Sequence, residues 1–291
     1  MKLTPRKVKI REVGPRDGLQ NEADFLPTEA KIEWINQLSA TGLDYIEATS
    51  FVHPRWIPAL ADADQVMKGI KRAPGVTYAA LVPNEKGLQR ALAADVDEVA
   101  IFLSASDSHS QKNINKSIEE ALIVLRETAT AALSAGKPVR GYVSTVFGCP
   151  YEGEVSLDAV LHVTEKLFEM GVPEVSLGDT IGVAHPRQVE GVLEAMLKRY
   201  PADRLALHFH DTRGMALVNT MLSLEMGIST FDSSVGGLGG CPYAPGASGN
   251  LATDDLLYML DGLGMETGVD RAKLLEAARF VKEKLAGSKV V

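Results

Sequence analysis

The chain alternates eight times between a short run rich in apolar and β-branched residues and a longer amphipathic segment. The β-type runs are residues 8–13, 45–49, 76–82, 98–103, 139–146, 174–177, 205–209 and 230–235. Helical patterns lie between them near residues 28–41, 58–70, 85–94, 117–135, 156–170, 186–199 and 214–226, and two more follow near 250–263 and 270–285. This alternation predicts parallel strands joined by helical crossovers, and eight such units close a barrel.

We therefore predict an α/β fold of the TIM class, a (β/α)₈ barrel with an additional C-terminal helix. The length of 291 residues suits one catalytic domain over residues 1–291, because no linker or composition shift divides the chain. The structural alternative is a doubly wound open sheet. The motif Gly14-Pro15-Arg16-Asp17-Gly18 after the first predicted strand is neither a dinucleotide fingerprint nor a P-loop, which favours the barrel.

The charge and cysteine content exclude several classes of function. A formal net charge of −8 and no run of Lys or Arg argue against binding to nucleic acid or an anionic membrane. No segment approaches the roughly 18 apolar residues that span a bilayer, and the basic N-terminus leads into no apolar signal-peptide region. Two cysteines in such a chain indicate a reducing compartment, so we expect a cytoplasmic protein.

Ionisable residues stand at the ends of several predicted strands. The active site of such a barrel is built from these carboxyl ends and the loops that follow them. The sequence places there Arg16 and Asp17 after the first strand, Glu47 in the second, Asp179 after the sixth, and His208 and His210 in and after the seventh. We therefore expect these side chains to meet at one rim.

The His208-Phe209-His210 triplet is the most informative local pattern. Strand alternation puts both imidazoles on one face, about 6.6–6.8 Å apart along the strand. A pair of hydrogen-bonded histidines is the alternative, but Asp17 and Asn250 complete a mixed nitrogen and oxygen set. Such a set favours a divalent cation with open positions, Mg²⁺ or Mn²⁺, over a closed zinc site, and leaves the choice between the two ions open.

A glycine-rich segment, residues 236–250, follows the eighth predicted strand and contains six glycines and Cys241. Its conformational freedom is typical of an active-site lid, so we expect Cys241 to be catalytic rather than structural. We expect the other cysteine, Cys149, to be structural. The pair Arg16-Asp17 admits two interpretations, a surface ion pair or an anion-stabilising fork beside a metal-binding carboxylate.

These motifs match a known family. Over nearly its whole length the sequence resembles the 3-hydroxy-3-methylglutaryl-CoA (HMG-CoA) lyases, and the strongest match is the cysteine loop, residues 237–244 and 246–253. Further matches are residues 14–22, 112–115, 148–153 and 177–182. The Arg-Asp and His-x-His elements are shared with a wider superfamily of barrel lyases and synthases, whereas the cysteine loop is far more specific.

The resemblance implies roles for particular residues. It implies metal ligation by Asp17, His208, His210 and Asn250, Arg16 at the thioester carbonyl, Cys241 as an acid/base in a mobile loop, and Glu47 and Asp179 as supporting acids. Lys112 and Asn113, on a predicted loop, are candidate substrate contacts, although a solvated turn explains them almost as well. One departure is Asp254, where the family pattern leads us to expect Glu.

The implied reaction is metal-dependent retro-Claisen cleavage of HMG-CoA to acetyl-CoA and acetoacetate, as in leucine degradation and ketone-body metabolism. His208 or Asp17 could serve as the base that takes the C3 hydroxyl proton. The alternatives are cleavage of a related 3-hydroxyacyl-CoA, a condensing enzyme or aldolase of the same superfamily, or a non-catalytic CoA-binding barrel. A small acyl-CoA is thus the expected partner, and a homodimer is compatible with the extra C-terminal helix.

Overall fold

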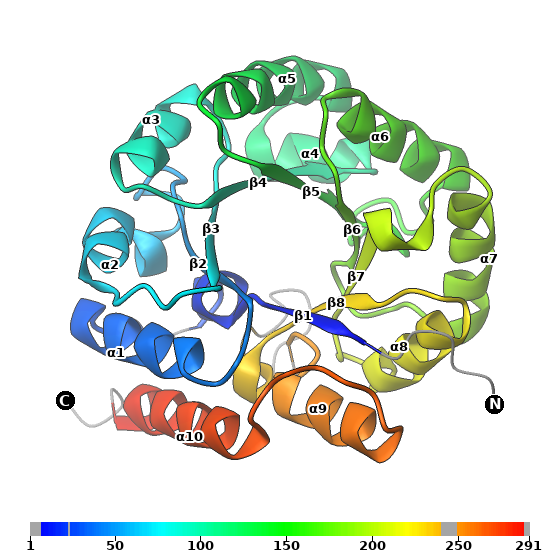
Figure 1. Cartoon of the computed structure of the whole chain (residues 1–291). Coiled ribbons are helices and arrows are strands. Elements are labelled where there is room, and N and C mark those ends of the chain that lie inside the picture. Colours follow the sequence, from blue (N-terminus) through cyan, green and yellow to red (C-terminus); the bar gives the residue numbers. More distant parts are fainter. Residues whose placement is uncertain (1–6, 23, 240–248, 288–291) are drawn as a thin grey trace.

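The computed structural model describes residues 7–22, 24–239 and 249–287. Its centre is a closed barrel of eight parallel strands in sequence order, with the first strand pairing with the eighth (Figure 1). The strands are β1 (Lys9–Glu12), β2 (Tyr45–Ser50), β3 (Thr77–Leu81), β4 (Glu98–Ser104), β5 (Val139–Ser144), β6 (Val175–Asp179), β7 (Leu205–Phe209) and β8 (Thr230–Ser233). The predicted barrel is confirmed, and the open-sheet alternative is wrong.

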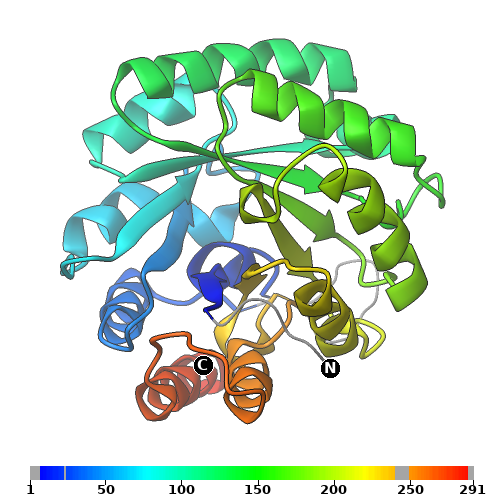
Figure 2. The same cartoon turned by 45° about the vertical axis from the view of Figure 1, so that its right-hand side comes forward.

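The helices form a ring around the barrel (Figures 1 and 2). They are α1 (Thr28–Ser39), α2 (Ala63–Gly69), α3 (Glu85–Ala93), α4 (Asp107–Ile114), α5 (Ile118–Ser134), α6 (Leu157–Glu169), α7 (Pro186–Leu197), α8 (Ala216–Glu225), α9 (Thr253–Gly262) and α10 (Arg271–Gly287). The predicted additional C-terminal helix is α10, which packs against both α9 and α1. Within the described part of the chain, no helix is long and apolar enough to cross a membrane.

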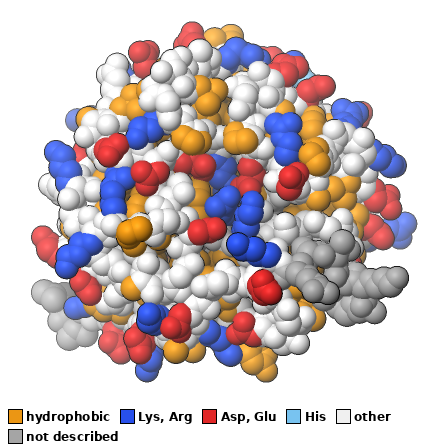
Figure 3. Space-filling view, viewed as in Figure 1, with side chains coloured by type: hydrophobic (Ala, Val, Ile, Leu, Met, Phe, Trp, Pro, Cys, Tyr) orange, Lys and Arg blue, Asp and Glu red, His pale blue; other side chains and the backbone are white. Residues whose placement is uncertain are grey.

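The hydrophobic core lies between the strands and the helices. Phe209 illustrates it, because this strand residue is fully buried and its ring lies 6.0 Å from that of Phe147. The opposite strand face points into the barrel, where a small apolar cluster that includes Leu81 and Ala100 lies beside buried polar side chains. The polar ones include Glu47, Arg140, Tyr142, His208 and Asp232. The outer face of the molecule seen in Figure 3 carries acidic and basic side chains interspersed. The main apolar core thus lies outside the barrel, and the barrel interior also accommodates buried charged and polar side chains.

Two helical segments differ from the predictions. Residues 58–70 form a 3₁₀ turn (Pro58–Leu60) followed by α2, instead of one continuous helix. Lys112 and Asn113 lie in α4 and not on the predicted loop. This helix escaped prediction because its sequence, Asp-Ser-His-Ser-Gln-Lys-Asn-Ile, lacks an apolar stripe. It is specified by its ends instead, since the Ser106 hydroxyl accepts a hydrogen bond from the backbone N–H of His109 and Asn115 adopts the left-handed conformation.

A single turn of π-helix (Gly14–Gly18) follows β1 and is entirely buried. The backbone N–H groups of Arg16 and Asp17 both donate to the carbonyl oxygen of Val13, at 3.1 and 2.7 Å. A Cβ atom at Gly14 would lie 2.5 Å from the Oε1 atom of Glu12, so only glycine fits there. Such bulged turns often occur at functional sites. Here the turn fixes the two charged side chains at the barrel rim.

Candidate metal centre and active site

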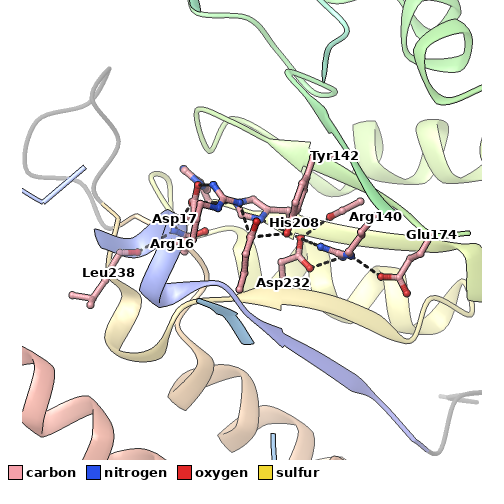
Figure 4. Close-up of polar contacts among 12 residues, drawn as sticks. Arg16, Asp17, Arg140, Tyr142, Glu174, His208, Asp232 and Leu238 are labelled. Carbon is pink, nitrogen blue, oxygen red and sulfur yellow. Dashed lines mark hydrogen bonds and ion pairs between the residues drawn. The ribbon is translucent and has the colours of Figure 1, made fainter. Parts of the chain in front are cut away.

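Three buried side chains, Asp17, His208 and His210, converge at the mouth of the barrel. One ligand atom from each lies within 4.8 Å of the others. The Nε2 atoms of His208 and His210 lie 3.6 and 3.7 Å from the same carboxylate oxygen of Asp17, and the two imidazole ring centres are 5.3 Å apart. Figure 4 shows Asp17 and His208 facing each other across the rim. The predicted convergence of the first and seventh strand ends is confirmed.

Asn250 joins this cluster from the far end of the glycine-rich segment. An isolated bridge with His210 holds the residue beside the end of β7. Its Nδ2 atom donates to the Oδ2 atom of Asp17 at 2.9 Å and to the carbonyl oxygen of Leu238 at 3.0 Å. Among the described residues, its buried Oδ1 atom has no hydrogen-bond partner. A buried amide oxygen of this kind usually requires a partner, so it supports a ligand at this point.

The donor set fits a divalent cation. A carboxylate, two imidazole nitrogens and an amide oxygen suit an ion of intermediate hardness. Burial raises the pKa of Asp17, but Arg16 and the two imidazoles outweigh burial and hold that pKa well below its usual range. The carboxylate is therefore ionised at neutral pH, as ligation requires.

Arg16 is buried and held from three sides, which makes the interpretation as a surface ion pair wrong. Its guanidinium bonds the Asp17 carboxylate through one nitrogen and donates to the Oε2 atom of Glu47 at 2.9 Å through another. The hydroxyl of Tyr142 donates to the same Glu47 oxygen at 2.9 Å, and the guanidinium lies 5.4 Å from the Tyr142 ring centre. Arg16 is thus a preorganised cation beside the cluster.

The chain is similar to known proteins over nearly its whole length. Residues 7–281 match the HMGL-like family model. The chain is 57% identical to a mitochondrial hydroxymethylglutaryl-CoA lyase of Bos taurus, over 97% of this chain and 86% of the relative. A crystal structure of the Bacillus subtilis HMG-CoA lyase superposes with a TM-score of 0.96 at 59% identity, covering 97% of this chain and 95% of that one. The chain belongs to the HMG-CoA lyase family.

A second solved structure of the family shows a ligand complex. It is an HMG-CoA lyase from Acinetobacter baumannii in complex with coenzyme A and 3-methylmalate. Its TM-score is 0.93 at 39% identity, over 98% of this chain and 93% of that chain. The match to HMG-CoA lyases therefore covers the whole barrel and the cluster at its mouth.

In this HMG-CoA lyase family member, Asp179 and the two cysteines are not part of the candidate metal-binding cluster that the structure describes. Both carboxylate oxygens of Asp179 accept backbone N–H groups, from Val183 and Ala184 at 3.0 Å each, so this side chain orders the loop after β6. Cys149 is buried, and its sulfur accepts a hydrogen bond from the Ser106 hydroxyl at 3.0 Å, as expected of a structural cysteine. Cys241 lies outside the described residues.

Sequence reasoning missed the polar layer beneath the cluster. It consists of Arg140 and Tyr142 on β5, Ser176 on β6 and Asp232 on β8. The sequence does contain a signal for this layer, because Arg140 and Tyr142 are two residues apart and so share one face of a largely apolar strand. Asp232 is also directly paired in register with His208. A charged residue inside such a strand normally points to a buried partner.

Glu12 is a further buried residue that sequence reasoning missed. Its carboxylate accepts from the backbone N–H groups of Gly14 and Val235, at 2.9 and 3.0 Å, and from the hydroxyl of Thr253 at 2.7 Å. It therefore ties the exit of β1 to the exit of β8 and to the start of α9. Asp254, the departure from the family pattern, still reaches the backbone N–H of Gly236 at 2.8 Å.

Glu12 should make stability depend on pH. Burial, opposed by the three hydrogen bonds, raises the pKa of Glu12 from 4.5 to about 7. Between pH 4.5 and about 7 the folded protein therefore binds more protons than the unfolded chain. The stabilisation that protonated Glu12 gives the folded state is complete below pH 4.5 and is lost as the pH rises through about 7. The free energy of unfolding, measured by urea denaturation, should fall by about 3 kcal/mol relative to that of Glu12→Gln across this window. A difference between the two proteins that is independent of pH would contradict this assignment.

Proposed function

We propose that this HMG-CoA lyase family member catalyses metal-dependent cleavage of HMG-CoA to acetyl-CoA and acetoacetate. Identities of 54–59% to hydroxymethylglutaryl-CoA lyases over nearly the whole chain make it a carbon–carbon lyase of that type. The observation that carries the proposal is the meeting of Asp17, His208 and His210 beside the buried guanidinium of Arg16.

The residues that would hold the cation are Asp17, His208, His210 and Asn250. A bound divalent ion supplies Lewis acidity to substrate oxygens and thereby acidifies a hydroxyl group. We infer Mg²⁺ or Mn²⁺, because the mixed set of nitrogen and oxygen donors is not a closed tetrahedral zinc site.

Different residues of the chain would remove a proton, stabilise the negative charge and return a proton. A base would take the C3 hydroxyl proton: Asp17 can do so with the cation bound, whereas His208 can do so only while its Nε2 atom is not bound to the cation. The C3 oxygen would then form the ketone carbonyl of acetoacetate, the bond between C2 and C3 would break, and its electron pair would move onto the thioester as an enolate. Arg16 would stabilise the enolate oxygen, a contribution on the order of a few kcal/mol. Cys241 would return a proton to C2, which completes acetyl-CoA. Glu47 would act by orienting Arg16, and Asp179 by ordering the adjacent loop.

The acyl-CoA partner finds support in the complex of the A. baumannii relative with coenzyme A. Lys112 and Asn113 are proposed contacts for it, because α4 directly follows β4 and so begins at the same barrel rim. Both side chains are exposed. A cytoplasmic location, a homodimer and a place in leucine degradation or ketone-body metabolism remain predictions.

One assay tests this function against its alternatives. The purified protein, incubated with HMG-CoA and Mn²⁺ or Mg²⁺, should release acetoacetate and acetyl-CoA in equal amounts, and EDTA should abolish both. A related acyl-CoA lyase would cleave another 3-hydroxyacyl-CoA faster, and a condensing enzyme would act only in the direction of synthesis. A CoA-binding barrel would bind CoA and release no acetoacetate. Any of these three results would overturn the proposal.

A further inference from the structure

The side of His208 that faces away from the cluster meets a buried carboxylate. Its Nδ1 atom lies 3.3 Å from the Oδ2 atom of Asp232, whereas its Nε2 atom faces Asp17. Asp232 lies on the neighbouring strand, and its side chain is completely buried. The two ring nitrogens of His208 therefore have different environments, one against a carboxylate deep in the barrel and one at the cluster.

Among the described residues, the other side chains that hydrogen-bond to the Asp232 carboxylate are donors. The Ser176 hydroxyl donates to Oδ2 at 2.7 Å, and the Arg140 guanidinium donates to Oδ1 at 2.7 Å and to Oδ2 at 3.3 Å. The Nε atom of Arg140 donates in turn to Glu174 at 2.8 Å. Figure 4 shows this row running from His208 to Glu174. Such a carboxylate can only accept from His208, which requires the proton on Nδ1. In the neutral imidazole, the form that binds a cation, the lone pair is then on Nε2.

Packing also limits the orientation of the His208 ring. Tyr142 meets it edge to face, with ring centres 6.2 Å apart and planes at 88°. The phenol is itself held by Glu47. The imidazole is thus fixed in tautomer by Asp232 and in orientation by Tyr142.

We propose that Asp232, held by Arg140 and Ser176, is a positioning residue that presents the Nε2 lone pair of His208 to the cation. The inference rests on the proposed metal centre. Partners of this kind commonly change metal affinity about 10–100-fold when they are removed. The role differs from ligation, because Asp232 contacts only the far side of the imidazole.

The test compares two isosteric variants, Asp232→Asn and Glu174→Gln, with the wild type. Each removes one carboxylate partner of Arg140, but Glu174 does not contact His208, which makes it the matched control. Affinity for Mn²⁺ alone is measured by electron paramagnetic resonance of the free ion, with thermal unfolding followed in parallel. We expect Asp232→Asn to weaken Mn²⁺ binding about tenfold or more and Glu174→Gln to change it less than about twofold.

The possible outcomes separate the inference from the proposed function. Two results would overturn the inference. Either both variants bind Mn²⁺ as tightly as the wild type, or both lose affinity to the same extent. In either case the ion pairs of Arg140 with Asp232 and Glu174 would act only structurally. Absence of Mn²⁺ binding by the wild type would overturn the metal centre, and the inference with it.

A second measurement uses the wild-type protein and therefore tests the inference even if Asp232→Asn does not fold. In wild-type protein labelled with ¹⁵N-histidine and loaded with Mg²⁺, two-bond ¹H–¹⁵N spectra report the tautomer of each imidazole. The His208 signals are assigned by comparison with a His208→Gln variant. We expect a proton on Nδ1 and none on Nε2. The opposite tautomer would overturn the inference.

Discussion

Replacing His210 by alanine is expected to weaken Mn²⁺ binding by more than about 100-fold, because loss of a direct ligand should exceed the 10–100-fold cost of losing an indirect partner. His210 faces the Asp17 carboxylate from just beyond β7, and its backbone is bridged to Asn250. The remaining carboxylate, imidazole and amide would leave an incomplete set of ligands. Isothermal titration with Mn²⁺ measures the effect directly.

His185→Ala is the matched control for this experiment. His185 is exposed at the start of α7 and outside the cluster, so its replacement removes an imidazole without touching the site. Its Mn²⁺ affinity should equal that of the wild type. Wild-type affinity in His210→Ala would show that the ligand set is drawn wrongly.

Replacing Cys241 by alanine should lower kcat by about 10²- to 10⁴-fold, the usual contribution of a general acid or base. Mn²⁺ affinity should remain nearly unchanged, because the proposed metal ligands are oxygen and nitrogen atoms of other residues. Steady-state kinetics with HMG-CoA at saturating Mn²⁺, together with a Mn²⁺ titration, separate the two quantities.

Cys149→Ala is the control that the chain itself offers. Its sulfur is buried against the Ser106 hydroxyl, so this variant should lose thermal stability and keep its kcat. An unchanged kcat in Cys241→Ala would remove the cysteine loop from the mechanism. A kcat that fell equally in both variants would point to a structural effect instead.

The fold and the cluster of Asp17, His208 and His210 could be predicted from the sequence, because both depend largely on local periodicity. Eight strand–helix alternations lead to a barrel, and the spacing of His208 and His210 puts both imidazoles on one strand face. The carboxyl ends of parallel strands share one rim, so Asp17 could be expected beside them. None of these steps requires knowledge of which distant side chains touch.

What could not be predicted depends on contacts between strands and on backbone irregularity. The partner of Asp232 is set by the register of β7 against β8, which no local pattern encodes. The π-turn that carries Arg16 and Asp17 inserts extra backbone into a segment that reads as a simple strand exit. Helix α4 is specified by its caps rather than by an apolar face, so the sequence pattern wrongly predicts a loop at Lys112 and Asn113.

Asn250 connects the proposed metal site to the glycine-rich segment that contains Cys241. Its amide bonds Leu238 on one flank of the cysteine segment and Asp17 in the cluster, while its own backbone forms the other flank. A Cβ atom at Gly239 would lie only 2.6 Å from that amide nitrogen, so the two flanks approach as closely as glycine allows. With Asn250 as a ligand, as proposed, the cation site and the junction of the two flanks would share one side chain. By thermodynamic reciprocity, any change that ion binding makes in the free energy of joining these two flanks must equal the change that joining them makes in ion affinity.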